Sequence, residues 1–295
     1  MCRRFRAIVA LLFFVFMFVD ATAQIPLRVA TWNIQEFGST SSTQWIRMVA
    51  VINRMDADVI ALEEVTDSSD VALVPTLASQ TAYPYHATSG ISGTMSGNLY
   101  TCVLSRYPIV FSASRTAAQI SGDATANDIT RDVFEVHVQV TGAAQRTAFF
   151  SAHLKSGSGG TNEFRRAVEL KRYVQAINAF KAAYPQSAFF MLGDFNEDLG
   201  DAPFGATFNA LPSGLPQTYD LGNDVSFPVV YDPFTYITGQ GTGFAIAVAT
   251  QEDTTNNFIT RQSSGRRLDY ILSTGGAVVS ADEVYNSAID DGVDN

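Results

Sequence analysis

The sequence contains little cysteine, little histidine and few basic residues, and it has no long apolar run beyond its amino-terminal segment. Its two cysteines are Cys2 and Cys102. Cys2 lies in a segment that we expect to be removed, so the remaining chain cannot form an internal disulfide. Stability must then come from a hydrophobic core, for which a hydrophobic content of 46% is ample. We expect Cys102 to be a buried apolar side chain in a strand.

Basic residues are outnumbered by acidic ones, 19 to 29, which gives a formal net charge of −10. An acidic surface argues against tight, non-specific binding to the phosphate backbone of nucleic acids. It does not exclude a nuclease, because a bound cation can supply the positive charge at a catalytic site.

Residues 1–23 have the features of a secretory signal peptide. The segment starts with the basic residues Arg3, Arg4 and Arg6 and continues with an apolar run over residues 7–19. It ends with Ala21-Thr22-Ala23, whose small residues are typical of a cleavage site. A membrane anchor is the alternative, but the apolar run is short for a span of about 20 residues. We therefore expect a secreted or periplasmic protein with no stable membrane anchor after cleavage, and a mature chain of residues 24–295.

The mature chain reads as one domain in which few helices interrupt the strands. Apolar runs and alternating patterns predict strands over residues 27–34, 58–62, 100–105, 188–192 and 267–272. They also predict a hairpin, in which a half-exposed strand of residues 130–140 pairs with a strand of residues 147–152. The spacing predicts helices over residues 44–55, capped by Thr43, over 70–80, broken by Pro75, and over 163–183, capped by Asn162. This order favours an α+β sandwich over a doubly wound sheet.

The longest predicted helix has a charged side that we assign to solvent. Its members are Arg165, Arg166, Glu169, Lys171 and Arg172. A cluster of this kind is typical of a solvated helix face.

A buried strand delivers an acid and an amide to one place. Residues 188–192 are a continuous apolar run that Gly193 ends. Asp194 and Asn196 follow at positions i and i+2, which point the same way in an extended chain. The alternative is a polar turn that merely closes a core strand.

Four other predicted strand ends also carry polar groups, namely Asn33, Glu64, His153 and Asp269. The pair Glu63-Glu64 is costly to bury unless it faces solvent or a cation, and an ordinary solvated strand end is the alternative. Oxygen ligands suit Mg²⁺, with Mn²⁺ or Ca²⁺ as alternatives, better than they suit zinc. Such a cation beside carboxylates and a histidine is suited to the attack of water on a phosphate ester.

Six fragments together give the chain a resemblance to the endonuclease/exonuclease/phosphatase family, which has the deoxyribonuclease I-like fold. They are Thr31-Trp32-Asn33 and residues 60–64, 104–109, 151–155, 193–196 and 267–270, in the family's order. The resemblance runs from about Arg28 to Thr274. It implies an α+β, four-layer sandwich of two mixed β-sheets packed face to face, with helices outside.

The resemblance also implies a role for each site residue. Glu64, with help from Asn33, would hold Mg²⁺. Asp194 would orient or deprotonate the attacking water, and Asn196 would position that water and stabilise charge on the phosphate.

The remaining site residues follow from the same resemblance. His153 would contact a non-bridging phosphate oxygen or act as an acid, and Asp269 would orient a second histidine. Arg131 would touch phosphate, with a solvated strand charge as the alternative. Glu63 stands where the family often has an amide, and we expect it to support the ligands of the cation.

The chain departs from the family in one respect. The family ends with an Asp-His pair on a last strand, but the only histidines here are His86, His137 and His153, and none follows Asp269. We expect that the chain is truncated at its carboxyl end, with a degenerate family member as the alternative.

The expected function is that of a secreted, Mg²⁺-dependent phosphodiesterase, a monomer that acts as a nuclease on nucleic acid. One alternative is a phosphatase or sphingomyelinase-like phospholipase of the same fold, acting on phosphorylated lipids or small molecules. Another is a non-catalytic binding domain that has lost its catalytic histidine. Loops determine substrate choice, and residues 87–97 and 199–265 carry no recognisable signature.

Overall fold

The computed structural model describes most of the expected domain. The described residues are 25–90, 99–199, 232–247, 250–251, 259–261, 264–274 and 283–284. The expected signal peptide, residues 1–23, lies outside them, as does most of the two long loops. Within the described ranges, none of the helices has the length and apolar character that a membrane span requires.

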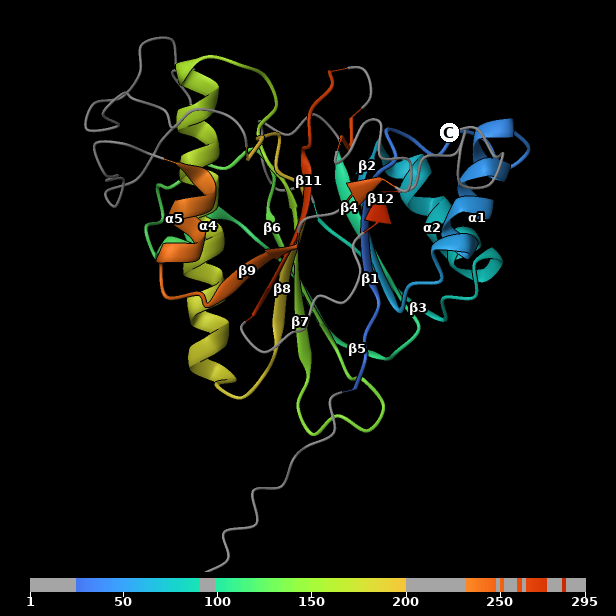
Figure 1. The fold of residues 1–295 in the computed structure, drawn as a ribbon, viewed down its shortest axis with the longest axis horizontal. Helices are drawn as coiled ribbons and strands as arrows, with labels where there is room; N and C mark the ends of the chain where they lie inside the picture. Colours follow the sequence, from blue (N-terminus) through green and yellow to red (C-terminus); the bar gives the residue numbers. More distant parts are fainter. Residues whose placement is uncertain are drawn as a thin grey trace, which may run out of the picture.

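Two mixed β-sheets lie face to face at the centre of the molecule (Figure 1). The smaller sheet contains, in spatial order, β1 (Val29–Asn33), β2 (Val59–Val65), β4 (Tyr100–Ser105) and β3 (Tyr85–Thr88). The larger sheet contains β5 (Ile109–Arg115), β6 (Val133–Val138), β7 (Thr147–His153), β8 (Phe189–Asp194), β11 (Asp269–Thr274) and β9 (Phe244–Ala247). Strand β1 is parallel to β2 and β7 to β8, and the other neighbours in these two sheets are antiparallel. A separate parallel pair consists of β10 (Thr250–Gln251) and β12 (Glu283–Val284).

The alternation of side chains along the strands builds three cores, which define four layers. Apolar side chains between the sheets include Val59, Ala61, Val103, Phe134, Val136, Val138, Phe149 and Leu192. Helices α1 (Thr43–Met55) and α2 (Ser68–Gln80) cover the outer face of the smaller sheet. Helix α4 (Gly160–Ala183) covers the larger sheet, with α3 (Ala117–Ser121) and α5 (Pro233–Gly239) beside it. The predicted four-layer α+β sandwich is thereby confirmed.

The predicted helices differ from expectation at their ends or in their middle. Helix α1 is capped by Ser42, whose Oγ accepts a hydrogen bond from the Trp45 amide at 3.1 Å, so Thr43 is already inside the helix. Helix α2 continues through Pro75, and the prediction that this residue breaks it is wrong. Proline removes one hydrogen bond from the helix interior, but Val74 and Leu77 hold the flanking turns in the core.

The charged side of α4 does not face solvent, contrary to the sequence-based assignment. Arg165, Arg166, Glu169 and Arg172 are buried, and only Lys171 is half-exposed. Arg166, Glu169 and Arg172 can be buried because carboxylates, backbone carbonyls and backbone amides partner them. Helix α4 begins at Gly160 with Gly159 as its N-cap, so Asn162 lies in its first turn and is not the cap.

Strand β6 is fully buried, so the prediction of a half-exposed strand is also wrong. Its two polar side chains, Glu135 and His137, contact each other at 2.7 Å, and the Arg115 side chain covers Glu135. The end of α4 covers His137 with the rings of Phe180 and Tyr184. Paired charges thus replace solvent on the outer face of this strand.

Candidate active site

The polar strand ends meet at one edge of the space between the two sheets. In the larger sheet, His153 of β7 pairs with Asp194 of β8, which in turn pairs with Asp269 of β11. In the smaller sheet, Asn33 of β1 pairs with Glu63 of β2. Residues two or four positions away on the same strands lie in the core between the sheets, so these side chains point into the same space.

A β-bulge brings the second glutamate of β2 into this space. The register between β2 and β4 shifts between Leu62 and Val65, and both of these side chains pack in the outer core. Strict alternation would put Glu64 on that outer side as well. Its backbone instead has a left-handed φ of 59°, which turns the carboxylate towards Asn33.

Asn33 connects two carboxylates. Its Nδ2 donates to Oε1 of Glu64 at 3.0 Å and to Oδ2 of Asp194 at 3.0 Å, while its Oδ1 accepts the amide of Gln35 at 3.1 Å. The Nε2 of His153 lies 3.4 Å from Oε1 of Glu64. The site therefore joins residues that are more than a hundred positions apart in the chain.

Glu64, His153 and Asp194 form a group that can hold a cation, since their ligand atoms all lie within 4.8 Å of one another. The two carboxylates give oxygen ligands, as a hard divalent cation requires. The chemistry of the side chains present thus fits the cation that the sequence predicted.

A turn places Asn196 next to Asp194. The Asn196 amide donates to Oδ1 of Asp194 at 2.7 Å, and its Nδ2 donates to the Leu154 carbonyl at 3.0 Å. The left-handed φ of 51° at Asn196 means that the two residues meet through a turn and not through an extended chain. Asp194 is thereby held at both oxygens, by Asn33 and by Asn196.

The carboxylates perturb one another because they are buried together. Burial raises the pKa of Asp194, and burial followed by the charge of Asp194 raises the pKa of Asp269 to about 7. Burial and then Asp269 raise the pKa of Glu63 well above its usual range, although the Thr31 hydroxyl donates to its Oε1 at 2.9 Å. Within the described part of the chain, Glu63 Oε2 and Asp269 Oδ1 are buried without a hydrogen-bond partner. Buried carboxylate oxygens in this state favour a nearby positive charge.

The surroundings of His153 favour its neutral form. Burial, followed by the charges of Arg131 and Lys155, holds its pKa well below the usual range. The other histidines lie elsewhere: His86 is in β3, paired with Leu104, and His137 contacts Glu135.

Arg131 lies in the bend just before β6 and is half-buried against the end of β7, and its role at phosphate stays a prediction. Its Nη1 donates to the carbonyls of His153 at 3.0 Å and Leu154 at 3.3 Å. These two bonds hold the guanidinium beside His153, at the wall of the site.

Sequence reasoning missed the residues that support the site from behind. Thr31 was detectable, because it stands two positions before Asn33 on the same face of β1. The supports from α4, chiefly Arg166 and Glu169, gave no local signal, because their partners lie in other segments.

Comparison with known proteins agrees with this geometry. The model of the Endonuclease/Exonuclease/phosphatase family matches residues 30–290. Comparison with curated protein sequences gives no match.

Several solved structures share the fold. An endonuclease/exonuclease/phosphatase protein from Beutenbergia cavernae is 18% identical with a TM-score of 0.56, covering 84% of this chain and 64% of that one. The human nocturnin catalytic domain, solved with a bound sulfate anion, is 13% identical with a TM-score of 0.56, covering 85% and 83%. Sphingomyelinase C from Streptomyces griseocarneus is 17% identical with a TM-score of 0.52, covering 86% of each chain. At these identities the similarity establishes the deoxyribonuclease I-like fold.

Proposed function

This chain belongs to the endonuclease/exonuclease/phosphatase family of phosphoric-ester hydrolases, and we propose that it is a secreted, Mg²⁺-dependent phosphodiesterase that cleaves nucleic acid. One observation carries the proposal. Glu64, His153 and Asp194 converge within 4.8 Å at one edge of the sandwich, with Asn33 donating to both carboxylates. We further propose that the protein works as a monomer, with Mn²⁺ or Ca²⁺ as alternative cations.

Glu64 would hold the cation with help from Asn33. When bound, Mg²⁺ polarises the phosphate and offsets the negative charge that develops on it. The position of Glu64 suits this role because its carboxylate lies between the Asn33 amide and the His153 imidazole.

Asp194 would orient the attacking water and accept its proton. The Asn33 side chain and the Asn196 amide fix its two oxygens, so the carboxylate has a defined direction. A raised pKa makes a carboxylate a better proton acceptor near neutral pH. Asn196 would help to position the water, and His153 would donate a hydrogen bond to a non-bridging phosphate oxygen.

Two further groups complete the proposed site. Arg131 would bring positive charge to the phosphate, since its guanidinium is held beside His153. Asp269 would add negative charge to the site, since its buried Oδ1 has no hydrogen-bond partner among the described residues and favours a nearby positive group.

The sulfate bound to the nocturnin domain has the tetrahedral shape of a phosphate group, which supports a phosphate ester as substrate. The similarity to sphingomyelinase C supports a second candidate, a phospholipase acting on a phosphorylated lipid. Both candidates use the same water attack, and they differ only in the group that carries the phosphate.

The deciding experiment compares two substrates. Purified protein with Mg²⁺ is assayed for cleavage of plasmid DNA and for release of choline phosphate from sphingomyelin vesicles. We expect DNA cleavage that EDTA abolishes and that Asp194→Asn lowers by about 10²–10⁴-fold, the usual contribution of one acid–base group. Asp232→Asn is the matched control, because asparagine is an equally good N-cap for α5 in the outer layer.

The other outcomes are equally informative. Choline phosphate release without DNA cleavage would favour the phospholipase. A protein that cleaves neither DNA nor sphingomyelin would favour a non-catalytic binding domain. Secretion is tested by amino-terminal sequencing of the exported protein, which should start at Gln24; a form that retains Arg3 would indicate an anchor instead.

A further inference from the structure

Helix α4 carries a stripe of polar side chains where an amphipathic helix normally carries apolar ones. Asn162, Arg166, Glu169 and Tyr173 follow the spacing i, i+4, i+7 and i+11, which places them on one face. We call these four residues the α4 polar stripe. Each of them bonds to the backbone between Ser151 and Ser158, the segment that contains His153.

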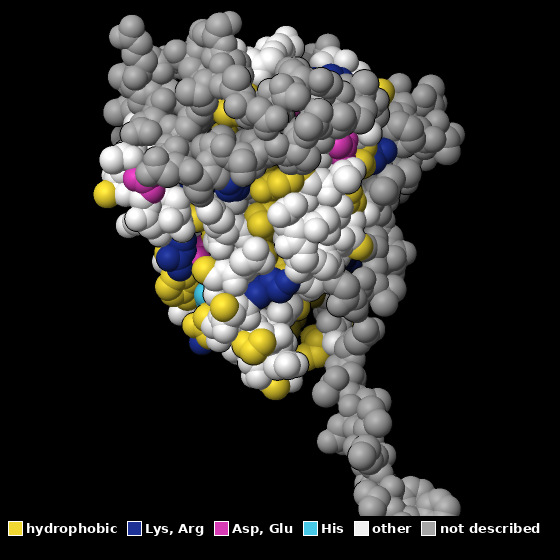
Figure 2. Space-filling model, turned by 90° about the vertical axis from the view of Figure 1, so that its left-hand side faces the viewer, with side chains coloured by type: hydrophobic (Ala, Val, Ile, Leu, Met, Phe, Trp, Pro, Cys, Tyr) yellow, Lys and Arg dark blue, Asp and Glu magenta, His cyan; other side chains and the backbone are white. Residues whose placement is uncertain are grey.

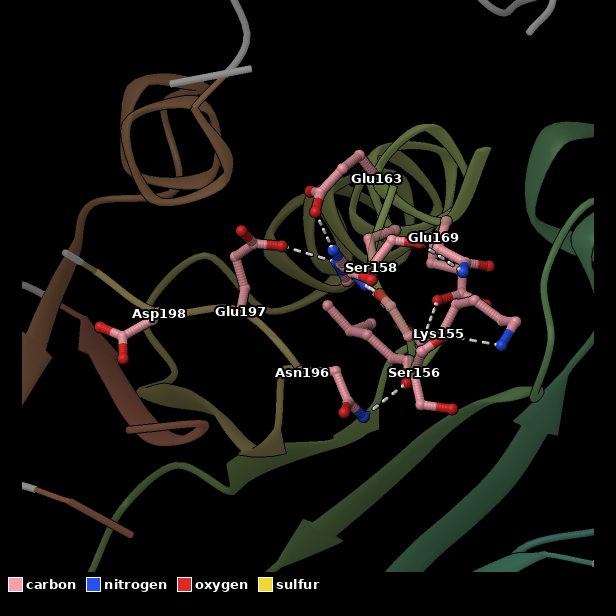
Figure 3. A network of polar contacts seen from close by, with 12 residues as sticks. Lys155, Ser156, Ser158, Glu163, Glu169, Asn196, Glu197 and Asp198 are labelled. Atoms are coloured by element: carbon pink, nitrogen blue, oxygen red, sulfur yellow. Dashed lines mark hydrogen bonds and ion pairs between the residues drawn. The ribbon is translucent and has the colours of Figure 1, made fainter. Parts of the chain in front are cut away.

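The contacts of the stripe follow this segment in order. The Tyr173 hydroxyl donates to the Ser151 carbonyl at 2.7 Å, and the Asn162 Nδ2 donates to the Ser158 carbonyl at 3.0 Å. Arg166 and Glu169 bind the residues in between. Figure 3 shows this network from close by, with the loop from Lys155 to Ser158 lying against α4.

Arg166 is the centre of the network and is only 2% exposed. Its Nη1 donates to the carbonyls of Lys155 at 2.9 Å and Gly157 at 2.8 Å, and its Nε donates to Oε2 of Glu197 at 2.6 Å. Its Nη2 pairs with Glu163 on the same helix. One guanidinium thus joins the segment after His153 to the segment after Asn196.

Glu169 joins a third segment to the same place. Its Oε1 accepts the Thr130 amide at 2.7 Å, and its Oε2 accepts the Lys155 amide at 2.7 Å. Thr130 immediately precedes Arg131. Both oxygens of this carboxylate therefore hold backbone next to residues of the proposed site.

The two catalytic segments are also bonded to each other. The Leu154 amide donates to the Asp194 carbonyl at 2.9 Å, and Asn196 donates back to the Leu154 carbonyl at 3.0 Å. A shift of the loop at Lys155 would therefore move His153 and Asn196 together. Geometry matters here because a misplacement of about 1 Å can cost 10²-fold in rate.

Stability alone does not explain this arrangement. Replacing buried ion pairs by well-packed apolar side chains is often neutral or even stabilising. We propose that Arg166 is a positioning residue, which fixes His153 and Asn196 for phosphoester hydrolysis through the Lys155 to Gly157 loop and Glu197. This proposal rests on the proposed function, and it predicts an effect on catalysis separate from the effect on folding.

The test compares two variants of Arg166 with a stability control. Arg166→Met keeps a long side chain and removes all of its hydrogen-bond donors. Arg166→Lys keeps the positive charge but not the planar arrangement of donors that the guanidinium provides. Ile177→Ala, in the fully buried core face of α4, is the control that lowers the melting temperature without touching the stripe. All are assayed with Mg²⁺ and plasmid DNA, well below their melting temperatures.

We expect Arg166→Met to lower kcat by about 10–100-fold with KM changed less than about threefold, because catalytic groups are displaced while the binding surface remains. Arg166→Lys should recover part of the loss. Ile177→Ala should keep the wild-type kcat. Arg166→Met with a kcat equal to that of the control would overturn the proposal.

A second measurement does not depend on activity. Amide hydrogen exchange of residues 154–158 and 195–198 should be faster in Arg166→Met than in the control, and unchanged exchange would overturn the proposal. If Arg166→Met does not fold, Arg166→Lys serves, because an ammonium group cannot reproduce the separate donations of the guanidinium to Glu197, Lys155 and Gly157. It should speed exchange in residues 154–158, and exchange at the wild-type rate would again overturn the proposal. A wild-type protein that leaves DNA intact would contradict the proposed function, while the exchange data would still judge the role of Arg166.

Discussion

Gly193 is the position at which one added methyl group should do the most damage. It pairs with Ala152 across the parallel strands β7 and β8, immediately before His153 and Asp194. Its φ is +138°, and a Cβ at this residue would lie 1.9 Å from the Ala152 carbonyl oxygen and 2.8 Å from its carbonyl carbon. These neighbours are backbone atoms, so no side chain can move aside and the two strands must separate.

Two costs add up for Gly193→Ala. A non-glycine residue at an unfavourable positive φ costs about 1–3 kcal/mol. Overpacking at a tightly packed position costs about 1–3 kcal/mol more. Unfolding free energy should therefore fall by roughly 4 kcal/mol, which lowers the melting temperature by on the order of 10 °C in a domain of this size.

Thermal unfolding followed by circular dichroism measures this loss. Gly122→Ala is the matched control, because Gly122 also has a positive φ, of +74°, but a Cβ there would meet no atom within 4 Å. Its cost should be about 1–2 kcal/mol, from backbone strain alone. Equal melting temperatures for the two variants would refute the argument that the close approach of β7 and β8 requires glycine.

Three further predictions follow from the site and the core. Glu64→Gln should weaken Mg²⁺ binding by roughly tenfold or more, because removing even a residue that only hydrogen-bonds to a metal ligand weakens binding that much. Calorimetry that detects no change in Mg²⁺ affinity would contradict the role of Glu64 as a ligand. Cys102 is fully buried, and burial raises its pKa to about 12. Its thiol should therefore react with a disulfide reagent only after denaturant unfolds the protein. A thiol that reacts in the folded protein as fast as an exposed cysteine would disprove this. Asp128→Ala should cost about 3–5 kcal/mol in urea unfolding, because it leaves Arg172 buried without this partner. The double variant Asp128→Leu/Arg172→Met should recover most of that loss, and a double variant as unstable as the single one would contradict the pairing argument.

The strand ends of the site could be predicted from the sequence because the signal is local. A buried apolar run followed by polar residues, as at Asp194, marks the edge of a sheet wherever the strand is placed. The period of two then gives the face, and in the structure Asn33, His153 and Asp269 point into the space between the sheets. The family's order of fragments supplied the topology, which no single fragment contains.

The bulge at Glu64 could not be predicted in the same way. Strict alternation from Val59 assigns Glu63 to the inner face and Glu64 to the outer one, yet Glu64 is the residue that contacts Asn33 and His153. Its left-handed backbone depends on the register with β4, a contact with residues nearly forty positions away. The strand end drew attention to the pair Glu63-Glu64, but only the resemblance to the family chose Glu64 as the residue that holds the cation, and it did so without a physical reason.

The polar face of α4 shows why charge is a poor guide to exposure in this chain. A helix with arginine and glutamate at these positions satisfies the usual pattern of a solvated face, and no residue within α4 contradicts it. The partners that make burial acceptable are backbone groups at Thr130, Lys155 and Gly157 and the carboxylate of Glu197. These groups are supplied by the loops that end at the site, so the same contacts that hide the charges also fix the ends of the strands. The burial of the charged side chains of α4 and the geometry of the site therefore depend on the same contacts. A substitution among these side chains should alter the position of the site residues, and a substitution in the loops should alter the packing of α4.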